Sequence, residues 1–132
     1  MNASRGEAAP TASRWLPVLA WAGFILVLTS WPNPRVPMSA SSIDKFAHFG
    51  LYGVLGFLVG RTIRPTHLVP SIVKALLVLA AFGAADEWHQ RFISGRSMSV
   101  WDWVADISGA FTGLLLAQLL LSLARARRDR PS

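Results

Sequence analysis

The feature that most constrains this chain is a series of four apolar stretches, each near the length that crosses a bilayer. A hydrocarbon core of about 30 Å needs roughly 20 mostly apolar helical residues. We expect spans at residues 15–31, 43–60, 68–85 and 104–123. Because they use most of the 132 residues, the predicted fold is all-α: a polytopic membrane protein with four transmembrane helices in a compact bundle.

The composition excludes several soluble classes. Hydrophobic residues make up 52% of the chain and charged residues only 15%, whereas an average soluble domain has about 25% charged residues. So few charges cannot cover the surface of a basic nucleic-acid-binding domain, despite the net charge of +6. Disordered chains are poor in apolar residues, and a chain with no cysteine has neither disulfides nor thiolate metal sites. We therefore expect membrane lipids as partners and no nucleic acid.

The predicted domain occupies residues 15–123, between an N-terminal tail (1–14) and a basic C-terminal tail (124–132). Arg5 and Arg14 before the first apolar run also fit a signal peptide. That run is longer than the usual apolar region of about 7–15 residues, and no small-residue cleavage site follows it, so we favour an uncleaved first span.

The distribution of basic residues predicts the orientation. Cytoplasmic loops collect Lys and Arg, and this bias sets the topology of short loops. With four spans, nine of these residues fall on one side and four on the other. The larger group contains Arg5, Arg14, Arg61, Arg64, Lys74, Arg125, Arg127, Arg128 and Arg130, and the smaller contains Arg35, Lys45, Arg91 and Arg96. Both termini are therefore expected in the cytoplasm (N-in/C-in) of a cell-membrane protein.

Polar residues recur every four positions in the second predicted span. Asp44, His48 and Tyr52 lie on one helix face, and Gly56 and Gly60 continue the row. Each polar residue alone fits an ordinary role as a helix cap, a satisfied histidine or an interfacial tyrosine. Polar groups inside membrane spans are costly, however, so three on one stripe equally indicate a functional site. The glycines would let another helix approach closely.

The end of the third span carries two adjacent carboxylates. Gly83, Asp86, Glu87 and Gln90 share roughly one helix face, whereas His89 lies off it and is interpreted as interfacial. Neighbouring carboxylates repel one another, which favours a retained proton and a general-acid role. The alternative is a solvated helix end.

The fourth span begins with two further acids. Ser99 and Asp102 fit a capping box, so Asp102 is either a helix cap or a site residue. Asp106 lies one turn deeper, where an unpaired charge is expensive, and Arg96 or Lys45 is its expected partner. Small residues then recur every four positions, which favours close helix packing or a dimer contact. They are Gly109, Gly113 and Ala117.

These polar residues all fall on the predicted extracytoplasmic face, which argues for one joint site. The candidate catalytic residues are Asp44, His48, Asp86 and Glu87. The candidate substrate-binding residues are Lys45, Tyr52, Gln90, Arg96, Asp102 and Asp106. The first four could also hold a hard metal ion, but their spacing is not diagnostic. We therefore predict neither a metal nor a cofactor.

Four motifs carry a family resemblance: DKFAHFGLY (44–52), DEWHQRF (86–92), GRS (95–97) and DWVADISG (102–109). Their order and spacing, from about Asp44 to Leu121, resemble the VanZ-like family of small integral membrane proteins. The resemblance implies a four-helix membrane domain and a link to low-level resistance to the glycopeptide teicoplanin. One departure is Asp106, where the family pattern usually has Asn.

Three classes of function remain. The first is an envelope-associated binding or accessory role, in which the outward polar site recognises a lipid-linked or glycopeptide ligand. The second is a membrane-embedded acid–base enzyme that acts on a lipid-linked or envelope substrate at the outer leaflet. A proton- or ion-coupled transporter is least favoured, because the remaining parts of the spans are apolar. The residues identify neither the ligand nor the oligomeric state.

Overall fold

The computed structural model describes residues 11–32 and 41–129, and this part of the chain is entirely helical apart from turns. Its elements are α1 (Thr11–Thr29), α2 (Ser41–Gly60), the short 3-10 helix η2 (Pro65–His67), α3 (Leu68–Gln90) and α4 (Val100–Arg128). The predicted all-α class is confirmed. The outer parts of the two predicted tails and the proline-rich segment 33–40, which includes Arg35, lie outside the described residues.

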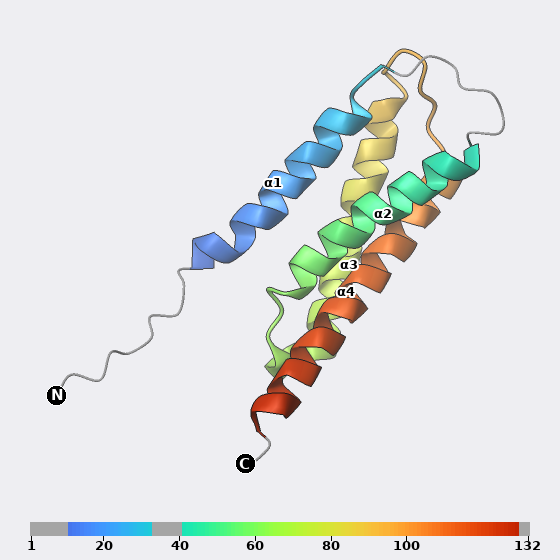
Figure 1. The fold of residues 1–132 in the computed structure, drawn as a ribbon. Coiled ribbons are helices and arrows are strands. Elements are labelled where there is room, and N and C mark those ends of the chain that lie inside the picture. The colour runs from blue at the N-terminus through green and yellow to red at the C-terminus, as the bar shows by residue number, and fades with distance from the viewer. Residues whose placement is uncertain (1–10, 33–40, 130–132) are drawn as a thin grey trace.

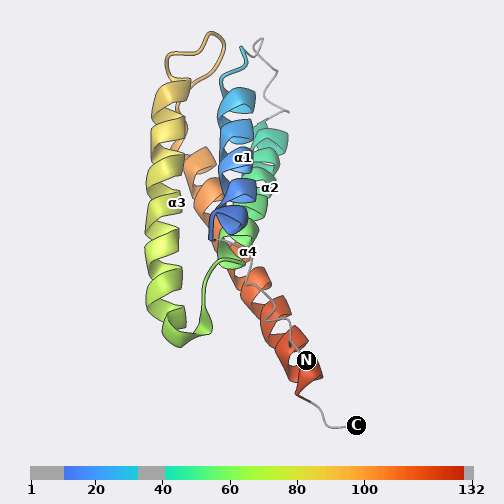
Figure 2. The same cartoon turned by 90° about the vertical axis from the view of Figure 1, so that its left-hand side faces the viewer.

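The helices alternate in direction along the bundle (Figure 1). α1 and α3 end where α2 and α4 begin, and this end is called the acidic end below. At the opposite end, which is called the basic end, α4 extends past the other helices (Figure 2). α2 and α4 therefore run parallel, side by side. The polar ends of α2, α3 and α4 therefore lie at the same end of the bundle, as the alternation of the predicted helices implied.

Small residues bring α2 and α4 into backbone contact. A Cβ atom at Gly56 would overlap the backbone of Ala110, and one at Gly109 would overlap the Phe49 carbonyl group. Such close approach needs a glycine at each of these contact points. The two predicted rows of small residues thus pack against each other within one chain.

Within residues 11–32 and 41–129, two helices are long and apolar enough to cross a membrane by length and composition alone, α3 and α4. The apolar part of α1, Ser13–Thr29, is shorter than a full span. α2 has charged residues near its N-terminus. The outer surface carries many exposed large apolar side chains, among them Leu16, Leu19, Val27, Val69, Leu77 and Val78. Apolar surface on this scale marks contact with lipid or protein, which is consistent with a membrane protein.

The core lies where the four helices meet, and hydrogen bonds from three long side chains fix their relative positions. Ile25, Tyr52, Leu55 and Leu114 are almost fully buried there. Trp21 Nε1 donates to the Leu51 carbonyl, Trp103 Nε1 to Ala80, and Gln118 Nε2 to Gly60. These bonds join α1 to α2, α4 to α3 and α4 to α2.

Candidate functional site

Asp86 on α3 is the centre of a first group of polar side chains, the Asp86 cluster. Its carboxylate is 1% exposed and accepts hydrogen bonds from Thr29 Oγ1 at 2.7 Å, Tyr52 OH at 3.3 Å and Gln90 Nε2 at 3.5 Å. These donors come from α1, α2 and α3, so one buried carboxylate joins three helices. Several neutral donors are what a buried carboxylate needs to offset its loss of water.

His48 on α2 is the centre of a second group, the His48 cluster. Its Nδ1 lies 2.9 Å from Asp106 Oδ1 on α4 and 3.8 Å from Glu87 Oε1 on α3. Glu87 also accepts the Ser99 backbone N–H through Oε2 at 2.8 Å. All three side chains of the cluster are buried. The expected partners of Asp106, Arg96 and Lys45, were wrong: His48 takes that place.

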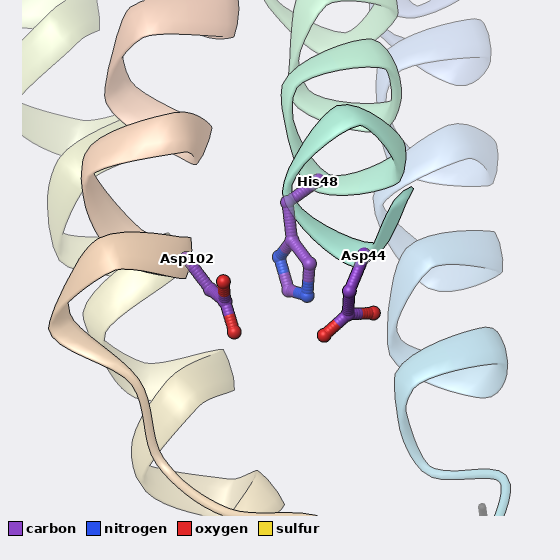
Figure 3. Close-up of side chains that lie close together, drawn as sticks. All are labelled: Asp44, His48 and Asp102. Atoms are coloured by element: carbon purple, nitrogen blue, oxygen red, sulfur yellow. The ribbon is translucent and has the colours of Figure 1, made fainter. Parts of the chain in front are cut away.

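Closer to the end of the bundle, two aspartates flank the His48 ring (Figure 3). Asp44 precedes His48 by one turn on α2, and Asp102 approaches from α4. Asp44 is half-buried, whereas Asp102 is buried and lies 3.2 Å from Lys45 Nζ. The Ser99 hydroxyl caps α4 by accepting the Asp102 N–H at 3.3 Å. Ser99 is thus the predicted cap, and the Asp102 carboxylate pairs with a cation instead.

Arg96 ties the α3–α4 loop to two helices. Its Nε and Nη2 donate to the carbonyl groups of Trp31 and Leu28 at 3.1 and 3.4 Å, and Nη1 donates to Gln90 Oε1 at 3.5 Å. Gly95, with φ of 80°, makes the turn before it in a conformation that favours glycine. Arg96 therefore satisfies carbonyl groups at the C-terminus of α1 and holds Gln90 toward Asp86.

Two carboxylate oxygens in the His48 cluster lack hydrogen-bond partners. Glu87 Oε1 and Asp106 Oδ2 are buried and accept no hydrogen bond from the described residues. Asp102 Oδ1 shares this property, but it lies 3.2 Å from Lys45 Nζ, whereas Glu87 Oε1 lies 3.8 Å from His48 Nδ1. Buried polar atoms without hydrogen-bond partners are rare in native proteins, so these oxygens are the least satisfied polar atoms of the cluster.

Two groups of side chains within the described residues have the geometry to hold a metal ion. One consists of Asp44, His48 and Asp102, and the other of His48, Glu87 and Asp106, with donor atoms within 4.8 Å of one another in each. The sequence suggested Asp44, His48, Asp86 and Glu87 as a set. The geometry divides that set, because Asp86 belongs to the cluster that neutral donors satisfy.

The ten predicted site residues all lie at the acidic end. Asp86, Tyr52, Gln90 and Arg96 form one connected group, and His48, Glu87, Asp106, Asp102, Lys45 and Asp44 form the other. His89 is exposed, as predicted. Sequence reasoning missed Thr29, which donates the shortest bond to Asp86. Its signal was a hydroxyl group in the last turn of an otherwise apolar first span.

A comparison with protein-family models covers most of the chain. A family model described as VanZ/LLP1 matches residues 5–121, a range that contains all four helices up to the last part of α4 and every residue of both clusters. No curated protein and no solved structure matches the chain.

Proposed function

The chain belongs to the VanZ/LLP1 family, and we propose that it is a four-span protein of the cell membrane with an outward-facing binding site. In this arrangement both termini lie in the cytoplasm and the acidic end faces the cell envelope. The division of basic residues, nine against four, supports the orientation. The exposed apolar faces of all four helices support the four spans.

The observation that carries the binding role is the pair of partnerless oxygens, Glu87 Oε1 and Asp106 Oδ2. A purely structural cluster would satisfy its buried acceptors, as the Asp86 cluster does. A bound ligand that presents a cation or hydrogen-bond donors completes them. Amino and hydroxyl groups of lipid-linked envelope molecules and glycopeptides supply such donors at headgroup level in the outer leaflet, which is why we propose an envelope-associated accessory role.

The orientation can be tested on the chain as it stands, because it contains no cysteine. We expect a membrane-impermeant maleimide to label Ser94→Cys, in the exposed α3–α4 loop, on intact cells. Ala126→Cys, an exposed position near the end of α4, should react only in inverted vesicles. Labelling of Ala126→Cys on intact cells would overturn the proposed topology.

The binding role can be tested by identifying what the purified protein retains. We expect mass spectrometry of the wild type to detect a lipid-linked envelope molecule that Glu87→Gln loses, since the substitution preserves shape but removes the charge. Asp129→Asn is the matched control, because Asp129 is an exposed acid at the basic end. Equal retention by both variants at equal membrane levels would contradict the proposal.

A second candidate function, acid–base catalysis, is favoured by the hydrogen bond between His48 and Asp106 at 2.9 Å. A histidine oriented by a carboxylate is a common general acid or base, and Glu87 Oε1, 3.8 Å from the same ring nitrogen, adds a second negative charge that stabilises the protonated imidazole. Catalysis predicts that Glu87→Gln still binds the retained molecule but no longer converts it to product. Pure binding predicts that no product forms even with the wild type.

A further inference from the structure

The four buried carboxylates of the acidic end do not have equal partners. Asp86 accepts hydrogen bonds from three neutral side chains, and Asp102 faces the Lys45 ammonium group at 3.2 Å. Glu87 and Asp106, by contrast, share one imidazole, that of His48. Even a fully protonated His48 supplies one positive charge to two buried negative ones. Burial of unbalanced charge is expensive, so this cluster needs a further positive charge, which either a retained proton or a bound cation provides.

We propose that a divalent cation supplies it, bound by His48 Nδ1 and by the carboxylates of Glu87 and Asp106. This inference deepens the proposed function, on which it rests for the accessibility of the site from outside. Bonds of about 2.0–2.6 Å from a metal to nitrogen and oxygen donors place two donors of one ion within roughly 5 Å of each other. The three donor atoms lie within 4.8 Å of one another, and the two partnerless oxygens become ligands.

The donor set indicates the class of metal. Two carboxylates and one imidazole suit Mn²⁺ and similar hard or borderline divalent ions better than the soft ions that thiolates select. Asp44 and Asp102 flank the same imidazole on the outer side, in a second group of metal-binding geometry. Because Asp44 is only half-buried, this outer group of donors lies nearer the surface than the inner one.

The test is a titration of the purified, chelator-treated full chain with Mn²⁺, followed by electron paramagnetic resonance. We expect one saturable site per chain, a loss of affinity of at least tenfold in Glu87→Gln and in Asp106→Asn, and no change in Asp129→Asn. Mn²⁺ should also raise the melting temperature of the wild type but not of Glu87→Gln. A wild type without saturable binding, or a Glu87→Gln variant that binds equally well, would overturn the proposal.

The result is separable from the proposed function. If the purified protein retains an envelope molecule but shows no Mn²⁺ site, the metal proposal fails and the binding role stands. If Mn²⁺ binds but the purified protein retains no envelope molecule, the metal proposal stands and the binding role fails.

The basic end carries a second, independent feature, a pocket of about 550 Å³ lined by four arginines. Arg14 comes from α1, Arg61 and Arg64 from the connection between α2 and α3, and Arg125 from α4. No acid is among the described residues that line it. Four guanidinium groups around one hollow make a site for an anion, because arginine matches phosphate with paired hydrogen bonds.

A mostly apolar groove of about 680 Å³ adjoins this pocket between α1, α2 and α3. The two hollows share Thr62, Ile63 and Arg64. His67 and Lys74 also line the groove near the basic end, and its remaining length is formed by side chains such as Leu19, Val59, Val78 and Phe82. A cationic pocket that continues into an apolar groove has the shape of a phospholipid site.

We propose that an anionic phospholipid binds here, with its phosphate on the arginines and an acyl chain in the groove. Basic pockets between membrane helices on the cytoplasmic side are suited to anionic headgroups. The proposal rests on the match between the arginines and a phosphate, and on the residues that the pocket and the groove share. It does not depend on any residue of the acidic end.

Native mass spectrometry of the full chain with phosphatidylglycerol and phosphatidylcholine tests the site. We expect the wild type to retain phosphatidylglycerol at least fivefold more than phosphatidylcholine, and the double variant Arg61→Gln/Arg64→Gln to lose that preference. Arg91→Gln, an exposed arginine of the other end, is the control. Val78→Trp, which fills the groove, should reduce retention of both lipids. Equal retention of the two lipids by the wild type, or an unchanged preference in the double variant, would overturn the proposal.

Discussion

The two ends of the bundle treat charge in opposite ways. At the acidic end, Asp86, Glu87, Asp102 and Asp106 are buried and held by specific partners from other helices. At the basic end, arginines line an open pocket or project from the exposed last turns of α4. A buried charge needs ion-pair or hydrogen-bond partners within the protein, whereas an exposed charge is stabilised by water. Matched substitutions at the two ends should therefore differ in effect, in an order set by burial.

The largest difference is expected between two aspartates. Asp86→Ala removes the acceptor of Tyr52 and Gln90 and leaves Thr29 only carbonyl groups of its own helix. The expected loss is about 3–5 kcal/mol of unfolding free energy, because each buried donor that loses its acceptor costs about 1–3 kcal/mol. Asp129→Ala, at the basic end, should leave the unfolding curve in detergent unchanged. An equal effect of the two substitutions would end the comparison.

A smaller difference is expected between two arginines. Arg96→Gln removes donors from the Trp31 and Leu28 carbonyl groups, which should cost about 1–2 kcal/mol. The loss should be local, so hydrogen exchange should accelerate at the end of α1 and remain slow in α2. Arg127→Gln serves as the control and should change neither. Protection at the end of α1 that survives Arg96→Gln would show that the loop does not hold this helix.

Two lysines provide a third comparison. Lys45 lies 3.2 Å from the buried Asp102, but its own side chain is 41% exposed. Solvent screening weakens the attraction within such an ion pair. Lys45→Gln should therefore cost only about 1 kcal/mol of unfolding free energy, because it leaves the buried Asp102 carboxylate without its cation. Lys74→Gln should have no effect on stability, as measured by chemical unfolding in detergent. A loss in Lys74→Gln as large as that in Lys45→Gln would show that burial of the partner does not matter.

The acidic end was predictable from sequence to the extent that it depends on single helices. The spacing of Asp44, His48 and Tyr52 defines a face within α2, and the alternation of helix direction brings that face to the ends of α3 and α4. Pairing across helices is a different matter. It depends on the register of α2 against α4, which the contact of Gly109 with Phe49 fixes.

That register explains both the wrong and the missed partners. With Phe49 beside Gly109, His48 faces Asp106 and Lys45 faces Asp102, one turn earlier on both helices. No periodicity within one helix contains this offset, so charge alone suggested Arg96 or Lys45 for Asp106. Thr29 was missed for the same reason, because its role depends on how α1 lies against α3.

The smallest effect on stability is expected at the arginines in the last turns of α4. Replacing Arg125, Arg127 and Arg128 with Gln should leave the melting temperature unchanged, because all three side chains are exposed. The same triple variant should nevertheless weaken the proposed orientation, since it reduces the charge bias from nine against four to six against four. Labelling of Ser94→Cys on intact cells should then decrease, and labelling of Ala126→Cys should appear. Unchanged labelling would show that these three arginines do not set the orientation.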